Sequence, residues 1–511
     1  MSVTVKTAKK IGFLAAISVL IGSIIGIGIF FKNNTVFANN EYNGIGVIIS
    51  WVLASIIALT TAFSFAEIGF NHRDGAGLAG ATERMYGHKF GRFIGFNNSF
   101  FYFAILNLSI AIFSAEAIVN IFVKDNASFP IHMGWVMLIA LALIVIFVLF
   151  NYLSLKWSSR FQMASTILKF VPLLMVALAG IIYGAMNPDM GLFSGHYETV
   201  NDAGETITKN VGGISINGIL SSIPAILFAY DSFLGVASLQ GEMENPQKKV
   251  PLVIIIGMGV CIAFYLFITI GQIMVGQGSA YGVFGAIFKD NPTAANALRI
   301  VLSIFILVCV LGVLNALVLV ALRGYQYAMQ YRIFYGYWYF NKFGGNNLKV
   351  GMITSFIIYG FWWIVMLIPS AILNTDAFVD GFSNFPTLFM FAIYGTVVLK
   401  GWLNRFTKKI HVTKMPGFMW VAPIAVIGCY LAFGYQFFYF FSVNAFMNPE
   451  ATINWGLFAT FGFQTKAYMS AICFFVMIAV FLVAPFINDG LIKLRYKKVD
   501  TMNILKKELL V

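Results

Sequence analysis

Long apolar runs separated by short polar stretches fill almost the whole chain. A helix needs about 20 apolar residues to cross a bilayer, and twelve runs are at or near that length. They cover residues 11–31, 45–69, 95–122, 134–152, 160–185, 213–240, 250–275, 297–322, 350–371, 384–402, 416–441 and 467–488. This pattern predicts an all-α polytopic membrane protein with twelve transmembrane helices.

The composition agrees with this prediction. Hydrophobic residues make up 59% of the 511-residue chain and charged residues only 10%, whereas soluble domains contain about 25% charged residues. The four cysteines all lie inside apolar runs, at spacings that suit neither disulfides nor metal ligands. We therefore interpret them as small core residues and expect neither a metal nor another cofactor.

The positions of the basic residues explain the formal net charge of +13. If the N-terminus is cytoplasmic, 26 of the 33 Lys and Arg residues fall in the two tails and the inner loops. Six fall on the outer side, Lys32 among them, and Lys169 lies inside a run. This asymmetry follows the positive-inside rule. We expect a multi-pass protein of the cell membrane with both termini cytoplasmic, in contact with lipid and with no nucleic acid as a partner.

The first run contains three glycines near its middle, Gly22, Gly26 and Gly28. Each glycine weakens a helix by about 1 kcal/mol relative to alanine. In hydrocarbon, an interrupted backbone persists only where protein or a water-filled cavity surrounds it. The run therefore predicts a broken helix whose exposed N–H and C=O groups form a binding site. Gly22 and Gly26 also have the small-xxx-small spacing of close helix packing, so both interpretations stay open here.

The sixth run is interrupted in a similar way. It contains Pro224, which breaks helices, and Asp231, a carboxylate near mid-membrane that is normally functional or paired. The two interrupted runs are five helices apart. This is the relation expected of two inverted five-helix repeats with a binding site at their interface.

Several motifs together resemble a known transporter superfamily. The first run, Gly22-Ser-Ile-Ile-Gly26-Ile-Gly28-Ile-Phe30, is similar to the first-helix signature of the amino acid–polyamine–organocation superfamily. Further matches are Phe228-Ala-Tyr-Asp-Ser-Phe233, then Gly241-Glu-Met-Glu-Asn-Pro246 with Pro251, Gly75-Ala-Gly77 with Gly91 and Gly95, and Glu67 at the end of the second run. The order and spacing of these motifs make the resemblance specific.

The resemblance implies a leucine-transporter-like fold, in which ten helices form two inverted repeats, helices 1 and 6 are discontinuous, and two further helices are peripheral. The expected parts are a cytoplasmic tail at 1–10, helices 1–5 at 11–185, an extracellular loop at 186–212, helices 6–10 at 213–402, helices 11–12 at 416–488 and a basic cytoplasmic tail at 489–511.

The resemblance also implies a free amino acid as the substrate. In this family its carboxylate contacts backbone N–H groups at the break of the first helix, which correspond to Gly26, Ile27 and Gly28. The N-terminus of the half-helix that begins there carries a partial positive charge, which favours an anion. Ile27 departs from the pattern, because the family usually has Ala, Ser or Thr at this position.

The amino group of the substrate contacts carbonyls near Ile24 and at the break of the sixth helix, which corresponds to Phe228, Ala229 and Asp231. Phe228 matches the aromatic residue that covers the substrate in this family. The alternative interpretation of Phe228 is a core or lipid-facing side chain. Asp231 either contacts a cationic substrate or holds the broken helix by accepting backbone N–H bonds.

Lys169 is a charged residue inside the fifth run. One interpretation is a lysine that snorkels to the inner interface, because Arg160 lies only nine residues earlier. The other is that Lys169 faces the break of the first helix, where sodium-driven relatives of the fold hold an ion, and acts in coupling. Burial favours the neutral form of a lysine, so such a residue can bind and release a proton.

Sodium coupling is disfavoured by the eighth run. Sodium sites in this fold use adjacent hydroxyl groups there, but residues 308–322 contain neither Ser nor Thr. The sequence thus predicts secondary active transport of amino acids by proton symport or by exchange. It leaves open which amino acid is carried, the coupling mode and the oligomeric state. Transport of a polyamine or a cationic amino acid is the alternative.

Other classes of function fit less well. A channel needs rings of like charge or carbonyl filters, and two broken helices in one chain offer neither. A non-transporting sensor on the same fold would need a signalling domain or a damaged site. We expect no enzyme, since no cluster of His and Cys, phosphate-binding loop or nucleophile motif is present. For Glu116 and Asn315, inside runs three and eight, the sequence predicts no more than hydrogen bonds between helices.

Overall fold

The computed structural model describes residues 12–69, 77–122, 131–191, 195–200, 206–231, 233–234, 246–340, 348–374, 376–412, 414–454 and 464–495. The predicted N-terminal tail, most of the C-terminal tail, Gly75 and the motif residues Gly241 to Asn245 lie outside these ranges.

Helices dominate the fold. The first half of the described chain contains α1 (Phe13–Ile24), α2 (Ile27–Asn39), α3 (Gly44–Gly69), α4 (Gly77–Tyr86), α5 (His88–Asn97), η1 (Asn98–Phe103), α6 (Ala104–Phe122), α7 (Met133–Leu153), α8 (Leu155–Leu168), α9 (Phe170–Met186), η2 (Pro188–Met190), β1 (His196–Val200), β2 (Thr206–Asn210) and α10 (Ile216–Tyr230). The second half contains α12 (Pro246–Val275), α13 (Ala280–Ile287), α14 (Pro292–Gln330), α15 (Tyr337–Phe340), α16 (Leu348–Leu373), α17 (Ala377–Thr407), α18 (Phe418–Phe438), η6 (Tyr439–Met447), β3 (Thr452–Asn454), β4 (Gln464–Lys466) and α19 (Ala467–Arg495).

The predicted class, an all-α polytopic membrane protein, is confirmed. Ten helical spans within the described ranges are long and apolar enough to cross a membrane. The bent pair α1 and α2 is an eleventh candidate, and α10 is apolar but has only 15 residues. The exact number of twelve spans therefore stays a prediction, as does a second half of the broken sixth helix, because residues 235–245 are not described.

The first helical region extends further than the apolar pattern predicts. The run ends at residue 31, but α2 continues to Asn39. The charge pattern counts Lys32 among the residues outside the membrane, but Lys32 lies within α2 and is 1% exposed, so it is a buried helical residue. The helix continues through polar residues because they find buried partners. Lys32 pairs with Asp380, and Asn33 bonds to Gln272 and to Trp51.

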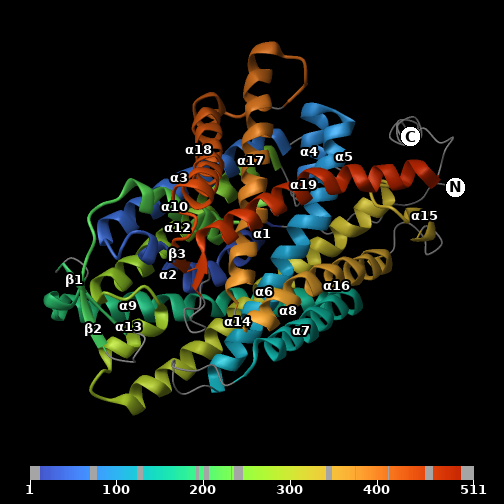
Figure 1. Ribbon diagram of the computed structural model, residues 1–511. Helices are drawn as coiled ribbons and strands as arrows, with labels where there is room; N and C mark the ends of the chain where they lie inside the picture. The colour runs from blue at the N-terminus through green and yellow to red at the C-terminus, as the bar shows by residue number, and fades with distance from the viewer. Residues whose placement is uncertain are drawn as a thin grey trace.

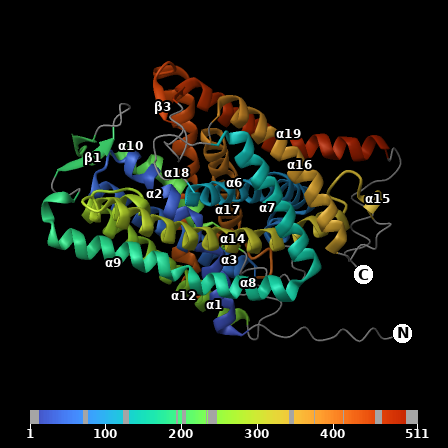
Figure 2. The same cartoon turned by 90° about the horizontal axis from the view of Figure 1, so that it is seen from below.

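Two short hairpins add strands that the sequence pattern did not predict. β1 pairs antiparallel with β2 within the predicted loop 186–212, and β3 pairs with β4 between α18 and α19. In Figure 1 and in Figure 2, β1 and α15 lie at opposite ends of the bundle. The charge pattern predicts that the end with β1 is extracellular, so we call it the outer end and the opposite end the inner end.

Packing brings the bent first span and α10 together. α1 packs on α12, α2 packs on α10, and α3 and α12 also contact each other. Three large aromatic side chains fill the space between them: Trp51, Tyr230 and Tyr265 are each 0% exposed, and their rings meet at centroid distances of 5.2 to 5.9 Å. Aromatic pairs at such distances stabilise a core beyond their burial alone.

At the inner end, Glu67 joins the end of α3 to α17. Its carboxylate accepts two hydrogen bonds from Arg405, at 2.9 and 2.5 Å, and one from the backbone N–H of Met415 at 2.7 Å. The side chain of Glu67 is 3% exposed. A buried carboxylate requires such complete pairing, so Glu67 fixes the inner ends of these helices.

Candidate functional site

The helix break in the first span lies at Ile25 and Gly26. α1 ends at Ile24, and Gly26 is the N-cap of α2 without any side chain to cap it. The first N–H groups of a helix have no partner within the helix. The backbone N–H groups at the start of α2 therefore face the break, together with the partial positive charge of the helix N-terminus. The side chain of Ile27 lies outside what the structure describes.

The predicted halves of the site lie directly against each other. A Cβ atom placed on Gly28 would overlap with the Cα and Cβ atoms of Ala229 on α10. One placed on Gly26 would overlap with Cγ2 of Val313 on α14. These two glycines permit approaches that no other residue allows. Gly22 packs against Thr166 in the same manner, as the small-xxx-small interpretation predicts.

Tyr265, a residue that the sequence motifs do not include, links the break of the first span to the end of α10. Its hydroxyl lies 2.9 Å from the carbonyl oxygen of Ile24 and 3.2 Å from that of Ala229. A hydroxyl has one hydrogen to donate, so it serves either carbonyl in turn. Both belong to the set of carbonyls that the resemblance assigns to the substrate amino group. No local pattern marks Tyr265, which is one of 22 tyrosines in the chain.

Lys169 lies inside the bundle between α8 and α9. It is 0% exposed, and its Nζ donates a hydrogen bond to the carbonyl oxygen of Gly22 at 2.5 Å. Gly312 on α14 packs closely against the neighbouring Ser165, since a Cβ there would overlap with Cβ and Oγ of Ser165 and would lie in ordinary contact, at 3.5 Å, with Cε of Lys169. This position is incompatible with snorkelling, because a snorkelling ammonium reaches the interface.

Asp231 is the C-cap of α10, directly after the predicted substrate-contacting residues. One carboxylate oxygen accepts a hydrogen bond from the hydroxyl of Tyr102 at 2.7 Å, and the other accepts one from Thr387 at 2.7 Å. Tyr102 belongs to the π-helix η1 and Thr387 to α17. The carboxylate thus ties the end of α10 to two other helices through the side-chain hydroxyls of Tyr102 and Thr387.

Phe228 is 6% exposed and lies one turn before Asp231 on α10. Its ring centroid is 4.8 Å from Nζ of Lys32, a distance at which a cation and an aromatic face attract each other. Phe228 is therefore not in contact with lipid.

Asn315 has the role that the sequence predicts. Its side chain bonds to Asn151, Ser158 and Gln162, which joins α14 to α7 and α8.

Within the described part of the chain, Glu116 does not have the hydrogen bonds between helices that the sequence predicts. It is 1% exposed, and none of the described residues shares a hydrogen bond with either of its carboxylate oxygens.

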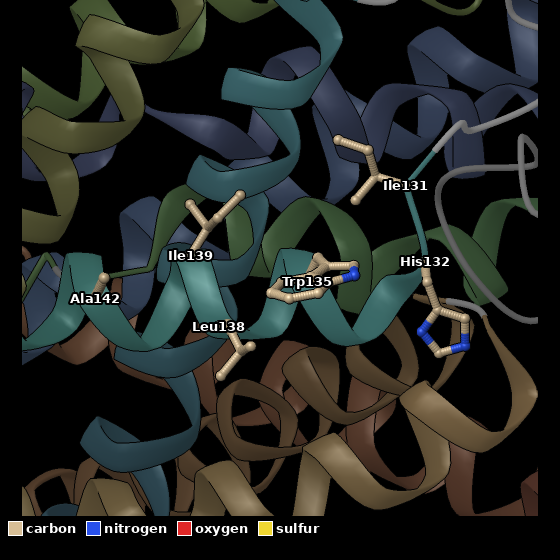
Figure 3. Close-up of a pocket in the computed structure, with 6 residues that line it drawn as sticks. All are labelled: Ile131, His132, Trp135, Leu138, Ile139 and Ala142. Atoms are coloured by element: carbon tan, nitrogen blue, oxygen red, sulfur yellow. The ribbon is translucent and has the colours of Figure 1, made fainter.

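A pocket on the surface of α7 does not belong to this site. Figure 3 shows its lining, which contains none of the predicted site residues: Ile131, His132, Trp135, Leu138, Ile139 and Ala142. Trp135 is 63% exposed and Leu138 is 45% exposed. A hollow with such an apolar, exposed lining on a spanning helix is typical of a surface in contact with lipid.

Comparison with known proteins identifies the family. A family model described as amino acid permease matches residues 11–463. The chain belongs to the amino acid permease family. This permease is 26% identical over 479 residues to an uncharacterized protein of Mycoplasma pneumoniae, covering 83% of both chains.

Two relatives have names that state an activity. The permease is 28% identical over 324 residues to the serine/threonine exchanger SteT of Bacillus subtilis, covering 61% of this chain and 66% of SteT. It is 26% identical over 450 residues to the b(0,+)-type amino acid transporter 1 of Mus musculus, covering 83% and 81%.

A solved structure supports the fold. The permease resembles MhsT, crystallised in complex with L-phenylalanine, with a TM-score of 0.54. The match covers 83% of this chain and 99% of MhsT at 12% identity. The predicted leucine-transporter-like fold class is thus confirmed.

Proposed function

We propose that this permease carries free amino acids across the cell membrane by secondary active transport with alternating access. The observation that carries the proposal is that backbone hydrogen-bond donors and backbone hydrogen-bond acceptors lie close together at one buried place. The first N–H groups of α2 face the break, and the carbonyls of Ile24 and Ala229 lie within reach of one hydroxyl. A zwitterion presents the complementary groups, a carboxylate for the N–H groups and an ammonium for the carbonyls.

The proposed contacts explain how binding drives closure. The carboxylate of the substrate binds the N–H groups of Gly26, Ile27 and Gly28 at the start of α2. The ammonium binds the carbonyls of Ile24 and Ala229 near the ends of α1 and α10. A substrate that bridges both breaks favours the state in which they are close together. Phe228 covers the bound substrate from the outer side.

Alternating access would then move one group of helices against the rest. The bent pair α1–α2, α3, α10 and α12 pack on one another, and we propose that they rock as a unit. Rigid-body rocking of one bundle around a fixed central site is the usual motion of transporters with inverted repeats. The site opens to the outer end in one position and to the inner end in the other, with both chain termini in the cytoplasm.

Coupling is proposed to use protons or exchange rather than sodium. Lys169 contacts the carbonyl of Gly22 near the end of α1 and lies against Gly312 of α14. The ammonium of a lysine in this position takes the place of a bound sodium ion.

Uptake by the purified protein in liposomes tests the proposal. Labelled amino acids are supplied with and without an inward proton gradient, and with and without unlabelled amino acids inside. We expect saturable uptake of at least one amino acid, suppressed by competing amino acids. Uptake driven by the gradient alone indicates a symporter, and uptake only into preloaded liposomes indicates an exchanger. Failure to transport any amino acid in any of these conditions would contradict the proposal.

A further inference from the structure

A group of charged side chains lies on the outer side of the break, and none of the roles described so far involves it. The cluster consists of Lys32 on α2, Glu116 on α6, and Asp376 and Asp380 at the start of α17. All four are buried, with exposed fractions from 0 to 4%. At a rise of about 1.5 Å per residue, Lys32 lies about 9 Å along α2 from Gly26. The cluster is therefore close to the proposed substrate site but distinct from it.

The cation of the cluster is already engaged. Lys32 forms an ion pair with Asp380 and donates a second hydrogen bond to the hydroxyl of Ser383 at 3.0 Å. Its Nζ also lies 4.8 Å from the ring centroid of Phe228 and 5.8 Å from that of Phe113. The pair connects α2 to α17, so it exists only while these two helices are together at the outer end.

Glu116 lies in surroundings that oppose a negative charge. None of the described residues donates a hydrogen bond to its carboxylate, and the charged groups that act on it are the carboxylates of Asp376 and Asp380. Arg299, near the start of α14, is engaged elsewhere, since it donates to the carbonyl of Asn120, one turn further along α6. An ionised carboxylate that is buried, without donors and beside like charges is strongly disfavoured.

We propose that Glu116 is a proton-binding site that links closure of the outer end to proton uptake. In the closed arrangement Glu116 holds a proton on its carboxyl group. When α2 and α17 separate, the Lys32–Asp380 pair breaks and water enters. The O–H bond of Glu116 then breaks, the proton passes to water, and the released Lys32 ammonium stabilises the carboxylate. Closure re-forms the ion pair and requires that Glu116 take up a proton again.

This inference rests on the proposed function, since coupling needs a transported substrate, but it assigns the proton to a residue other than Lys169. Two measurements test it separately. The first is infrared difference spectroscopy of the full-length purified protein between acidic and mildly alkaline pH. A buried protonated carboxyl group has its own C=O stretching band, and we expect Glu116→Gln to remove one such band. The control variant Glu450→Gln should keep it, because Glu450 has a side chain that is 76% exposed.

The second measurement is transport in liposomes by the wild-type protein and both variants. We expect Glu116→Gln to retain exchange of amino acids, because glutamine resembles a protonated glutamate in shape. Its response to a proton gradient should fall by about tenfold, the usual scale of coupling between two sites. The variant Glu450→Gln should respond as the wild-type protein does.

Other results would overturn the inference in distinguishable ways. Three results would reject Glu116 as the coupling site: a carboxyl band that survives in Glu116→Gln, a gradient response that Glu116→Gln leaves unchanged, or no gradient response in the wild-type protein. In each case, amino acid exchange by the wild-type protein would still uphold the proposed function. Selective loss of cationic amino acids in Glu116→Gln, with the proton response intact, assigns the cluster to a substrate side chain instead. Absence of any amino acid transport by the wild-type protein rejects the proposed function itself.

Discussion

The ammonium of Lys169 donates a hydrogen bond to the carbonyl oxygen of Gly22, two residues before α1 ends at Ile24. The last four carbonyls of a helix have no partner within the helix, and Gly22 contributes one of them. A cation at this end also interacts favourably with the partial negative charge of the helix C-terminus. Lys169 thus stabilises the interrupted form of the first span.

Replacement of Lys169 by alanine should therefore impair transport more than folding. Lys169→Ala removes the cation and leaves the Gly22 carbonyl without its partner. We expect the rate of uptake to fall by about tenfold or more, while insertion and purification yield change little. The measurement is uptake in liposomes at acidic, neutral and alkaline pH.

Lys156 provides the matched control, because it lies in the same membrane span, Lys156–Met186, but is exposed. Lys156→Ala should transport normally at every pH. If Lys169→Ala also transported normally across the whole pH range, Lys169 would have no part in coupling.

Asp231 should prove to be a positioning residue rather than a contact for a cationic substrate. Its carboxylate accepts hydrogen bonds from Tyr102 and Thr387, and hydrogen bonds to a charged acceptor contribute about 1.5–3 kcal/mol. We expect Asp231→Asn to lower the thermal stability of the purified protein and to slow uptake of all its substrates alike. A competition panel measures the second effect. Selective loss of cationic amino acids, with unchanged stability, would instead place Asp231 at the substrate.

Tyr265 should compete with the substrate for the carbonyls of Ile24 and Ala229. Tyr265→Phe removes the hydroxyl, so without substrate one carbonyl loses its donor at a cost of about 1 kcal/mol. We expect a lower unfolding temperature without substrate. Saturating substrate should then raise that temperature by more than it does for the wild-type protein, because its ammonium restores the missing donor.

Thermal unfolding with and without the transported amino acid measures both quantities. Tyr183→Phe is a suitable control, since Tyr183 lies half-buried on α9, away from the breaks. An equal stabilisation by substrate in Tyr265→Phe and in the wild-type protein would show that the ammonium binds elsewhere.

Much of the fold follows from the sequence, because each span is a local property. Twenty apolar residues in a row predict a spanning helix wherever the chain later places them. The extension of α2 through Lys32 and Asn33 could not be predicted in this way. Its partners Asp380 and Gln272 are 348 and 239 residues away, and only the folded chain reveals that these polar side chains are compensated.

The same distinction applies to the site. The glycines of α1–α2 and the residues around Phe228 form local motifs, so the sequence alone is enough to identify them. Tyr265 and Glu116 have no such motif. Tyr265 matters because α12 places its hydroxyl between the carbonyls of Ile24 and Ala229, and Glu116 because α6 and α17 bring three carboxylates together. Neither fact is encoded in the neighbouring sequence.

The central claim is that backbone groups at the break of the first span bind the substrate. Equilibrium binding of a labelled amino acid to purified Gly26→Val tests this claim most directly, with the amino acid that the wild-type protein takes up fastest. A Cβ at Gly26 would overlap with the side chain of Val313, whereas one at Gly259 on α12 meets nothing within 4 Å. We predict that Gly26→Val is folded but binds no amino acid, and that Gly259→Ala binds as the wild-type protein does. Binding of wild-type affinity by Gly26→Val would contradict the account.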